Sequence, residues 1–144
     1  MKKFLFTICL FFVIIIIILV VNYNNFQKKQ MEIQKFNKIF EQYNAEDLNG
    51  LDITTVINKA IDNNEKYQIA KDEKGIYIAD NEKSVKIYIT MIINEKTYPM
   101  EKLNALGMES FIEYFGAVSF KCTDIKYHSK NGRVSEMTFE ATEY

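Results

Sequence analysis

The chain has 144 residues, of which 48% are hydrophobic and 26% are charged, and its net charge at pH 7 is −1. This balance provides no basic surface of the kind that binds nucleic acid. One histidine and two cysteines are too few for a zinc centre with conventional ligand spacing or for a disulfide framework. Lysine supplies nearly all the basic residues, and isoleucine and asparagine are abundant. This usage indicates an AT-rich bacterial genome.

An apolar segment without charge follows Lys2 and Lys3. It covers residues 4–21, from Phe4 to Val21, with the sequence FLFTICLFFVIIIIILVV. A helix of that length extends roughly 27 Å, close to the ~30 Å thickness of a bilayer's hydrocarbon core. A cleavable signal peptide has a shorter apolar core followed by small residues, and neither feature occurs here. We therefore predict a basic N-terminus over residues 1–3 and an uncleaved, single-pass signal anchor over residues 4–21, held by the lipid bilayer.

The lysines on the two sides of this span favour opposite orientations in the membrane. Lys2 and Lys3 precede the span, and four lysines follow it at positions 28, 29, 35 and 38. Positive charge near a span favours the cytoplasmic side, so the count alone places the following domain in the cytoplasm. A very short basic N-terminus before an apolar segment favours the opposite arrangement. We predict that the protein is in the bacterial cell membrane with its domain outside the cytoplasm.

Residues 22–49 have the pattern of an amphipathic helix. Apolar side chains recur at intervals of three and four residues at Ile33, Phe36, Phe40 and Tyr43, with charged residues between them. No glycine or proline occurs before Gly50, which is suited to follow a helix end. The apolar stripe either packs on the protein's own domain or pairs, through residues 26–46, with a second copy or with a helix of a membrane or envelope partner.

Residues 50–144 are predicted to form a small α+β domain. A helix begins at Asp52 as the N-cap and ends near Asn63 and Asn64. Alternation of period two then predicts an antiparallel sheet with one or two short helices. Its predicted strands cover residues 76–78 and 85–93 and the residues around Tyr98, where Pro99 requires a sheet edge or a strand end. A short helix is expected from Met108 to Gly116.

The last predicted hairpin can be assigned a register. A three-residue loop, Lys130-Asn131-Gly132, with Gly132 in the left-handed conformation predicts three pairs: Ile125 with Met137, Thr123 with Phe139 and Tyr127 with Ser135. This register gathers the apolar side chains on one face. It also requires Phe120 and Cys122 to face the other way, or a bulge near Thr123.

Two tyrosines are candidates for a partner surface. Tyr77 and Tyr88 alternate with isoleucines, so both are expected to face away from the apolar side of the sheet. Aromatic residues are enriched at interfaces, so these side chains are suited to bind a partner. The alternative is that they cover a half-exposed sheet or contact the amphipathic helix.

Residues with chemical reactivity are few and scattered. His128 stands between Lys126 and Lys130 and is expected at a surface position of a strand. Cys122 lies in an alternating strand without a His-Asn or His-Asp set around it, and is expected in the core. We therefore predict no catalytic residue, no metal site and no cofactor. A small envelope enzyme is the alternative that this pattern disfavours.

The order of a lipid-like helix, an amphipathic helix and a small α+β domain resembles type IV pilins and pseudopilins over residues 1–45. In that family a leader ends in glycine, followed by an aromatic residue and, shortly after, a glutamate. Here Phe4 follows Lys3 and position 8 is isoleucine, so no functional residue carries over. The hypothesis is a non-catalytic interaction or assembly component of the cell envelope. The resemblance implies the alternative, a pilin-like structural subunit.

Overall fold

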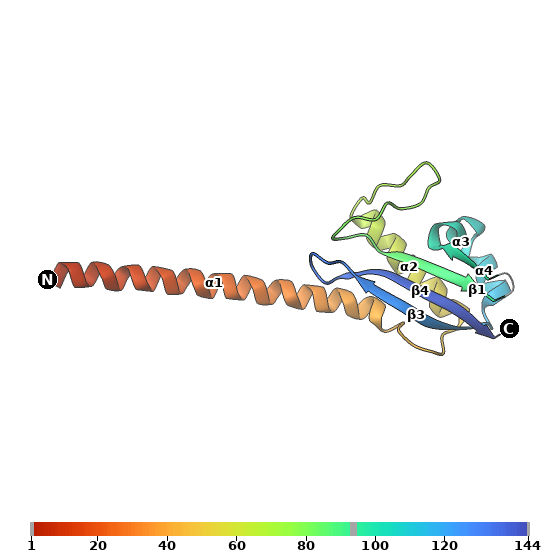
Figure 1. The fold of residues 1–144 in the computed structure, drawn as a ribbon, viewed down its shortest axis with the longest axis horizontal. Coiled ribbons are helices and arrows are strands. Elements are labelled where there is room, and N and C mark those ends of the chain that lie inside the picture. The colour runs from red at the N-terminus through yellow and green to blue at the C-terminus, as the bar shows by residue number, and fades with distance from the viewer. Residues whose placement is uncertain (1, 93–94, 144) are drawn as a thin grey trace. The chain divides into compact units, whose positions relative to one another are not determined.

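A computed structural model describes residues 2–92 and 95–143 and divides the chain into two compact units, Met1–Lys35 and Phe36–Tyr144 (Figure 1). Helix α1, Lys2–Glu41, begins in the first unit and ends in the second. The second unit contains three helices and four strands in its described residues. They are α2 Gly50–Lys66, β1 Lys86–Met91, β2 Lys96–Pro99, α3 Met100–Leu106, α4 Met108–Phe115, β3 Ser119–Tyr127 and β4 Val134–Glu143. The predicted α+β class is confirmed.

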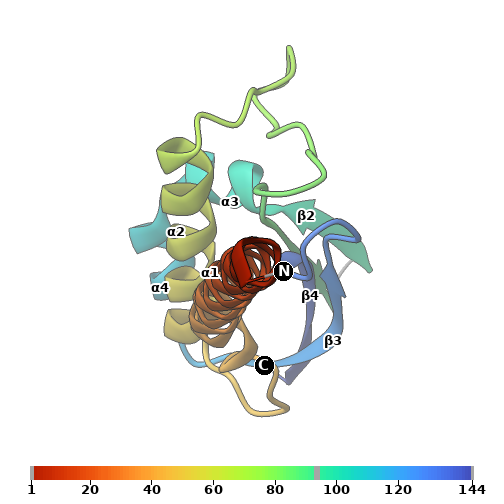
Figure 2. The ribbon, with the colours of Figure 1, turned by 90° about the vertical axis from the view of Figure 1, so that its left-hand side faces the viewer.

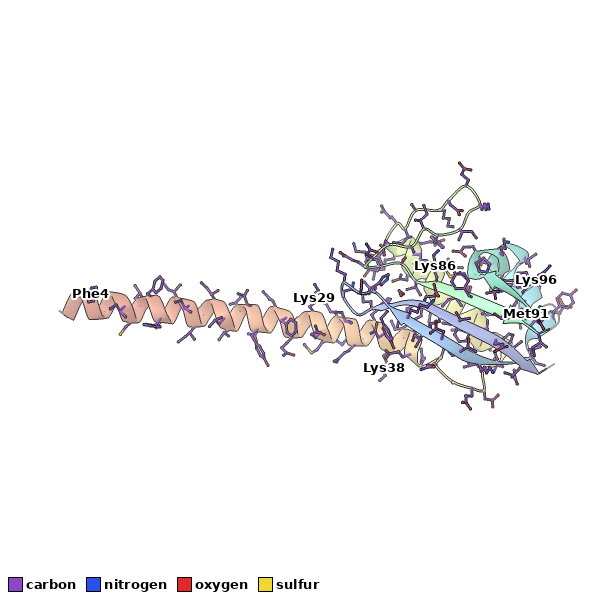
Figure 3. All side chains as sticks on the ribbon, in the orientation of Figure 1. Phe4, Lys29, Lys38, Lys86, Met91 and Lys96 are labelled. Atoms are coloured by element: carbon purple, nitrogen blue, oxygen red, sulfur yellow. The ribbon has the colours of Figure 1, made fainter. Side chains whose placement is uncertain are left out.

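The apolar part of α1 exposes its side chains. Phe4 and Val21 have exposed fractions of 73% and 50%, and Figure 3 shows side chains projecting all round this part of the helix. Within the described helix Ile8–Glu41, the most apolar stretch of 18 residues has no buried side chain. The helix is long and apolar enough to cross a membrane.

Helix α1 ends at Glu41 rather than at the expected Asn49. Leu48 instead forms an isolated β-bridge with Phe120, with N···O distances of 2.9 and 2.7 Å in the two directions. That pairing requires an extended backbone at Leu48, so the helix cannot continue to Asn49. Gly50 accordingly begins α2 and does not follow α1.

The N-terminus of α2 is capped by Asn49, so the expectation that Asp52 caps it was wrong. The Asn49 side chain accepts hydrogen bonds from the N–H groups of Leu51 and Asp52, and the Asp52 carboxylate accepts one from the Asn49 N–H. These reciprocal bonds form a capping box. A Cβ at Gly50 would lie 2.2 Å from the carbonyl oxygen of Phe115, so close packing against the end of α4 explains this glycine.

The sheet is mixed, which corrects the predicted antiparallel sheet. Its strand order is β2-β1-β4-β3, with β1 and β4 parallel and the other two pairs antiparallel. Side-chain alternation predicts which face of a strand is buried and carries no information about its neighbour, so the parallel pair could not be read from it. Pro99 ends the edge strand β2, as predicted. Figure 2 shows α2 and α4 to one side of the strands.

Residues 76–78 do not form the predicted strand. Among the described residues, their only β pairing is an isolated antiparallel bridge between Lys71 and Tyr77. The predicted strand over residues 85–93 is represented by β1, whose two ends, Lys86 and Met91, are labelled in Figure 3. Ile93 and the turn at Asn94 lie outside the described residues.

The central pair of the predicted final hairpin and the left-handed Gly132 are confirmed. Ile125 pairs with Met137, and Gly132 has a φ of 72°. A register shift between Cys122 and Asp124 leaves Thr123 as the extra residue of a bulge. Cys122 therefore pairs with Phe139, so the expected pairing of Thr123 with Phe139 was wrong and the alternative, a bulge near Thr123, is confirmed. Tyr127 pairs with Val134 and not with the expected Ser135, because the register shifts again between Lys126 and Tyr127.

Asn64 joins α2 to the start of the sheet. Its side chain has no exposed surface. The carboxamide donates to the carbonyl oxygen of Val85 at 2.7 Å and accepts from the Val85 N–H at 2.8 Å. A carboxamide has the same donor and acceptor as a peptide group, so Asn64 pairs with Val85 as a neighbouring strand would.

Replacing Asn64 with alanine should therefore leave the buried N–H and C=O of Val85 without partners. An unsatisfied buried group costs about 1–3 kcal/mol, so we expect Asn64→Ala to lower the free energy of unfolding by about 2–4 kcal/mol. Denaturant unfolding of the full chain in detergent micelles measures the change. Asn58→Ala, at an exposed position of the same helix, is the control and should change stability by less than about 0.5 kcal/mol. Equal losses in the two variants would contradict this role.

Candidate functional site

The second unit contains a pocket of about 240 Å³ around Arg133, the arginine just before β4. We call it the Arg133 pocket. Its lining consists of Phe36, Ile39 and Phe40 from α1, Lys59, Asp62, Asn63 and Lys66 from α2, and Tyr67 and Arg133. Aromatic and aliphatic side chains thus share this pocket with three cationic side chains and one carboxylate.

The guanidinium of Arg133 lies close to two aromatic rings. Its Cζ is 3.7 Å from the centroid of the Phe36 ring and 5.1 Å from that of Tyr67, within the range of cation–π attraction. Nη2 donates a long hydrogen bond of 3.4 Å to Asn63 Oδ1. Nε is buried and has no hydrogen-bond partner among the described residues.

Asparagine side chains hold the loop that carries Arg133. Asn37, near the end of α1, accepts a hydrogen bond from the Val134 N–H at 2.9 Å and donates one to the Gly132 carbonyl at 2.8 Å. Asn131 accepts one from the Arg133 N–H at 3.0 Å. The backbone on both sides of Arg133 is therefore fixed, which positions its side chain against α1 and α2.

The turn over residues 80–84 brings a further cation to the Tyr67 ring. The Asp80 carboxylate accepts hydrogen bonds of 3.0, 2.6 and 2.8 Å from the N–H groups of Glu82, Lys83 and Ser84. Burial acts to raise the pKa of Asp80, but these bonds outweigh it and lower the pKa from 3.8 to about 2. The organised turn places Lys83 Nζ 5.3 Å from the centroid of Tyr67.

Positive charge collects around the Arg133 pocket without matching carboxylates. Lys59 and Lys66 line it with Arg133, and Lys83 lies over the same Tyr67 ring. Within residues 2–92 and 95–143, none of these four cations forms an ion pair. Asp62 is the one carboxylate among the described lining residues. The arrangement is suited to hold an anion.

The residues of the predicted helical stripe lie in both units. Phe40 and Tyr43 are buried in the core of the second unit, and Phe36 packs against that core. The Phe36 and Phe40 ring centroids are 5.2 Å apart. These three side chains thus pack on the protein's own domain, one of the two predicted uses. Ile33 belongs to the first unit.

The two candidate tyrosines differ in exposure. Tyr88 is partly exposed and alternates with buried neighbours along β1, which is the expected orientation. Tyr77 is only 2% exposed, so the expectation that it faces away from the core was wrong. Its N–H donates to the Glu101 carboxylate at 3.0 Å, and Lys71 Nζ lies 4.4 Å from its ring centroid. Because residues 76–78 are not a strand, the period of two does not apply to them.

His128 is not at the surface, which corrects the expectation. It is 6% exposed, and its Nε2 lies 2.8 Å from the Ser84 carbonyl oxygen. Cys122 is half-buried and packs against the core, near its expected place. Burial raises the pKa of its thiol, which lowers the reactive thiolate fraction. Within the part of the chain that the structure describes, no three His, Cys, Asp or Glu side chains are grouped to hold a metal ion.

The Arg133 pocket could not be predicted from the sequence, because its parts are far apart along the chain. Phe36, Asn63 and Arg133 come from three different elements, and no spacing rule connects them. The one feature of the sequence that points to Arg133 is composition, since it is the one arginine among 18 basic residues. A lysine at this position could not present the same planar group to two rings.

Comparisons with family models, with curated proteins and with solved structures find no match to this chain.

The charge of Asp80 should stabilise the fold in a pH-dependent way. Because its pKa is lower in the folded state, this contribution is complete above about pH 4 and is lost as the pH falls through about 2. We expect Asp80→Asn to lower the free energy of unfolding near pH 6 by about 1 kcal/mol, allowing for the exposure of this side chain. Chemical unfolding from pH 6 to pH 2.5 should show the difference from the native chain shrinking. Asp47→Asn, at an exposed position, is the control. If the difference in free energy of unfolding between Asp80→Asn and the native chain stayed constant from pH 6 to pH 2.5, this role of Asp80 would be contradicted.

Proposed function

We propose that this chain is a single-pass bacterial membrane protein whose α+β domain lies outside the cytoplasm and serves as a non-catalytic interaction or assembly component of the cell envelope. The observation that carries the proposal is the apolar part of α1. Its side chains are exposed from Phe4 to Val21 among those described, and so many apolar side chains in water would be strongly unfavourable. A lipid bilayer is the solvent that suits this surface.

A non-catalytic role is supported by the environments of the two most reactive side chains. His128 is buried against the Ser84 carbonyl, and its ring is therefore engaged in the fold. Burial raises the pKa of the Cys122 thiol, which makes it a weaker nucleophile at neutral pH. Neither residue lies in an arrangement that would activate it.

The proposed partner surface contains fewer residues than the sequence predicted. Phe36, Phe40 and Tyr43 pack within the second unit, so they already have partners in the monomer. Tyr88 is partly exposed on β1, and Ile33 is on α1 in the first unit. These two residues remain as proposed contacts for an envelope protein or for a second copy.

A pilin-like structural subunit is the second candidate. The observation that favours it is that α1 is a single helix of 40 residues whose apolar segment comes first and whose end contributes Phe40 to the domain core. In this reading the span itself mediates assembly between copies.

Reporter fusions test the proposed location. Alkaline phosphatase joined after Tyr144 should be active, because it folds only outside the cytoplasm, and green fluorescent protein at the same place should be dark. The matched control lacks residues 4–21 and should give the reverse pattern with the reporter in the soluble fraction. An inactive phosphatase fusion, together with a green fluorescent protein fusion that fluoresces in the membrane fraction, would contradict the proposed orientation.

Crosslinking in cells separates the two candidates. An interaction component should give one discrete crosslinked product, and this product should persist when residues 4–21 are replaced by an unrelated transmembrane helix. A pilin-like subunit should give a ladder of self-crosslinked species that the same replacement abolishes. A ladder that depends on residues 4–21 would overturn the first proposal in favour of the second.

A further inference from the structure

We propose that the Arg133 pocket binds an anionic group, a phosphate or a carboxylate, carried by a small molecule or lipid headgroup with a short apolar part. This inference goes beyond the proposed function and does not depend on the orientation of the membrane span. It rests on the state of one guanidinium and on the walls around it.

The Arg133 guanidinium is partly buried and forms no ion pair with a described residue. Nε is buried and has no hydrogen-bond partner among the described residues, and the Nη2 bond to Asn63 is long at 3.4 Å. The rings of Phe36 and Tyr67 attract the face of the cation but cannot accept its in-plane N–H groups. An anion that accepts hydrogen bonds from the terminal N–H groups stabilises such a partly buried cation, and a phosphate or carboxylate fits the planar donor fork of arginine.

The charges around the pocket favour the same class of ligand. Lys59 and Lys66 line it from α2, and Lys83 lies over the Tyr67 ring. Asp62 is the one carboxylate of the described lining, against three lining cations. Lys59 donates to the Tyr43 hydroxyl at 2.9 Å, which holds its ammonium group in place. An entering anion thus meets a net positive site.

The size and walls of the pocket limit what the anion can be attached to. A cavity of about 240 Å³ is below the usual range of sites for drug-sized ligands, roughly 300–1,000 Å³. Ile39 and Phe40 add apolar surface beside Phe36. The pocket therefore suits a monophosphate or monocarboxylate that places a short apolar substituent against these side chains.

A purely structural role for Arg133 is the competing explanation. In that case the guanidinium clamps the hairpin loop to Phe36 and Tyr67, and no anion binds. The clamp explains the contacts with the two rings, but it leaves Nε unsatisfied. The two explanations differ in whether a small anion binds at all.

Calorimetric titration of the full chain tests the proposal, with phenyl phosphate as the probe. In uncharged dodecyl maltoside micelles we expect saturable binding at one site per chain, at least fivefold tighter than that of inorganic phosphate. Phenol should not bind. Arg133→Gln should weaken binding at least tenfold, and Lys66→Gln, at an exposed position that leaves the fold intact, about two- to fourfold. Lys121→Gln removes a cation that does not line the pocket and pairs with Glu140, so it should bind as the native chain does.

A second arm identifies the source of the anion. The titration is repeated with the full chain in phosphatidylglycerol nanodiscs. Binding in micelles that is lost in these nanodiscs supports the proposal with a lipid headgroup as the ligand, and binding in both supports a soluble ligand. Absence of saturable binding in micelles, or binding that neither Arg133→Gln nor Lys66→Gln weakens, would overturn the proposal and leave Arg133 as a structural clamp.

Discussion

Burial of the last turns of α1 in the domain core is the constraint on which the rest of the second unit depends. Phe40, in the last turn of α1, has 1% of its surface exposed, and Tyr43, just after the helix end, has 8%. The domain core therefore begins within the helix and not after it. Asn37 lies on the same turns and holds the backbone on both sides of Arg133. Once these residues are in place, the hairpin loop and the Arg133 pocket are positioned as well.

One helix therefore meets two different requirements. Residues 4–21 are apolar without a charged residue, which suits lipid. Further along the helix Phe40 is buried in the protein core and Phe36 packs against it. An apolar stripe can be satisfied by a domain of the same chain or by a partner, and in this chain its later part is taken up by the domain.

Asparagine carboxamides replace strand neighbours at two places in the second unit. Asn64 pairs with both backbone groups of Val85, and Asn37 bonds the N–H of Val134 and the carbonyl of Gly132. Each one ties a helix to the start of a strand. From sequence, Asn63 and Asn64 read as a helix end because asparagine is a poor helix former, yet α2 continues to Lys66. Their long-range partners outweigh that weak preference.

Local features of the fold could be predicted and long-range ones could not. The Ile125–Met137 register and the left-handed Gly132 follow from turn chemistry and side-chain alternation, which act over a few residues. The parallel pairing of β1 with β4 and the burial of Tyr77 and His128 depend on segments far away in the chain. The Arg133 pocket belongs to this second group, since Phe36, Tyr67 and Arg133 meet only in the folded domain.

Hydrogen–deuterium exchange of the full chain in lipid nanodiscs tests the double role of α1 most directly. Amides exchange slowly where lipid or a stable core protects them and faster in a solvated helix that opens locally. The double role of α1 predicts slow exchange over residues 8–21 and again over residues 36–41, with faster exchange over residues 24–34 between them. Exchange over residues 36–41 as fast as that over residues 24–34 would contradict it, as would exchange over residues 8–21 at the rate of a water-exposed helix.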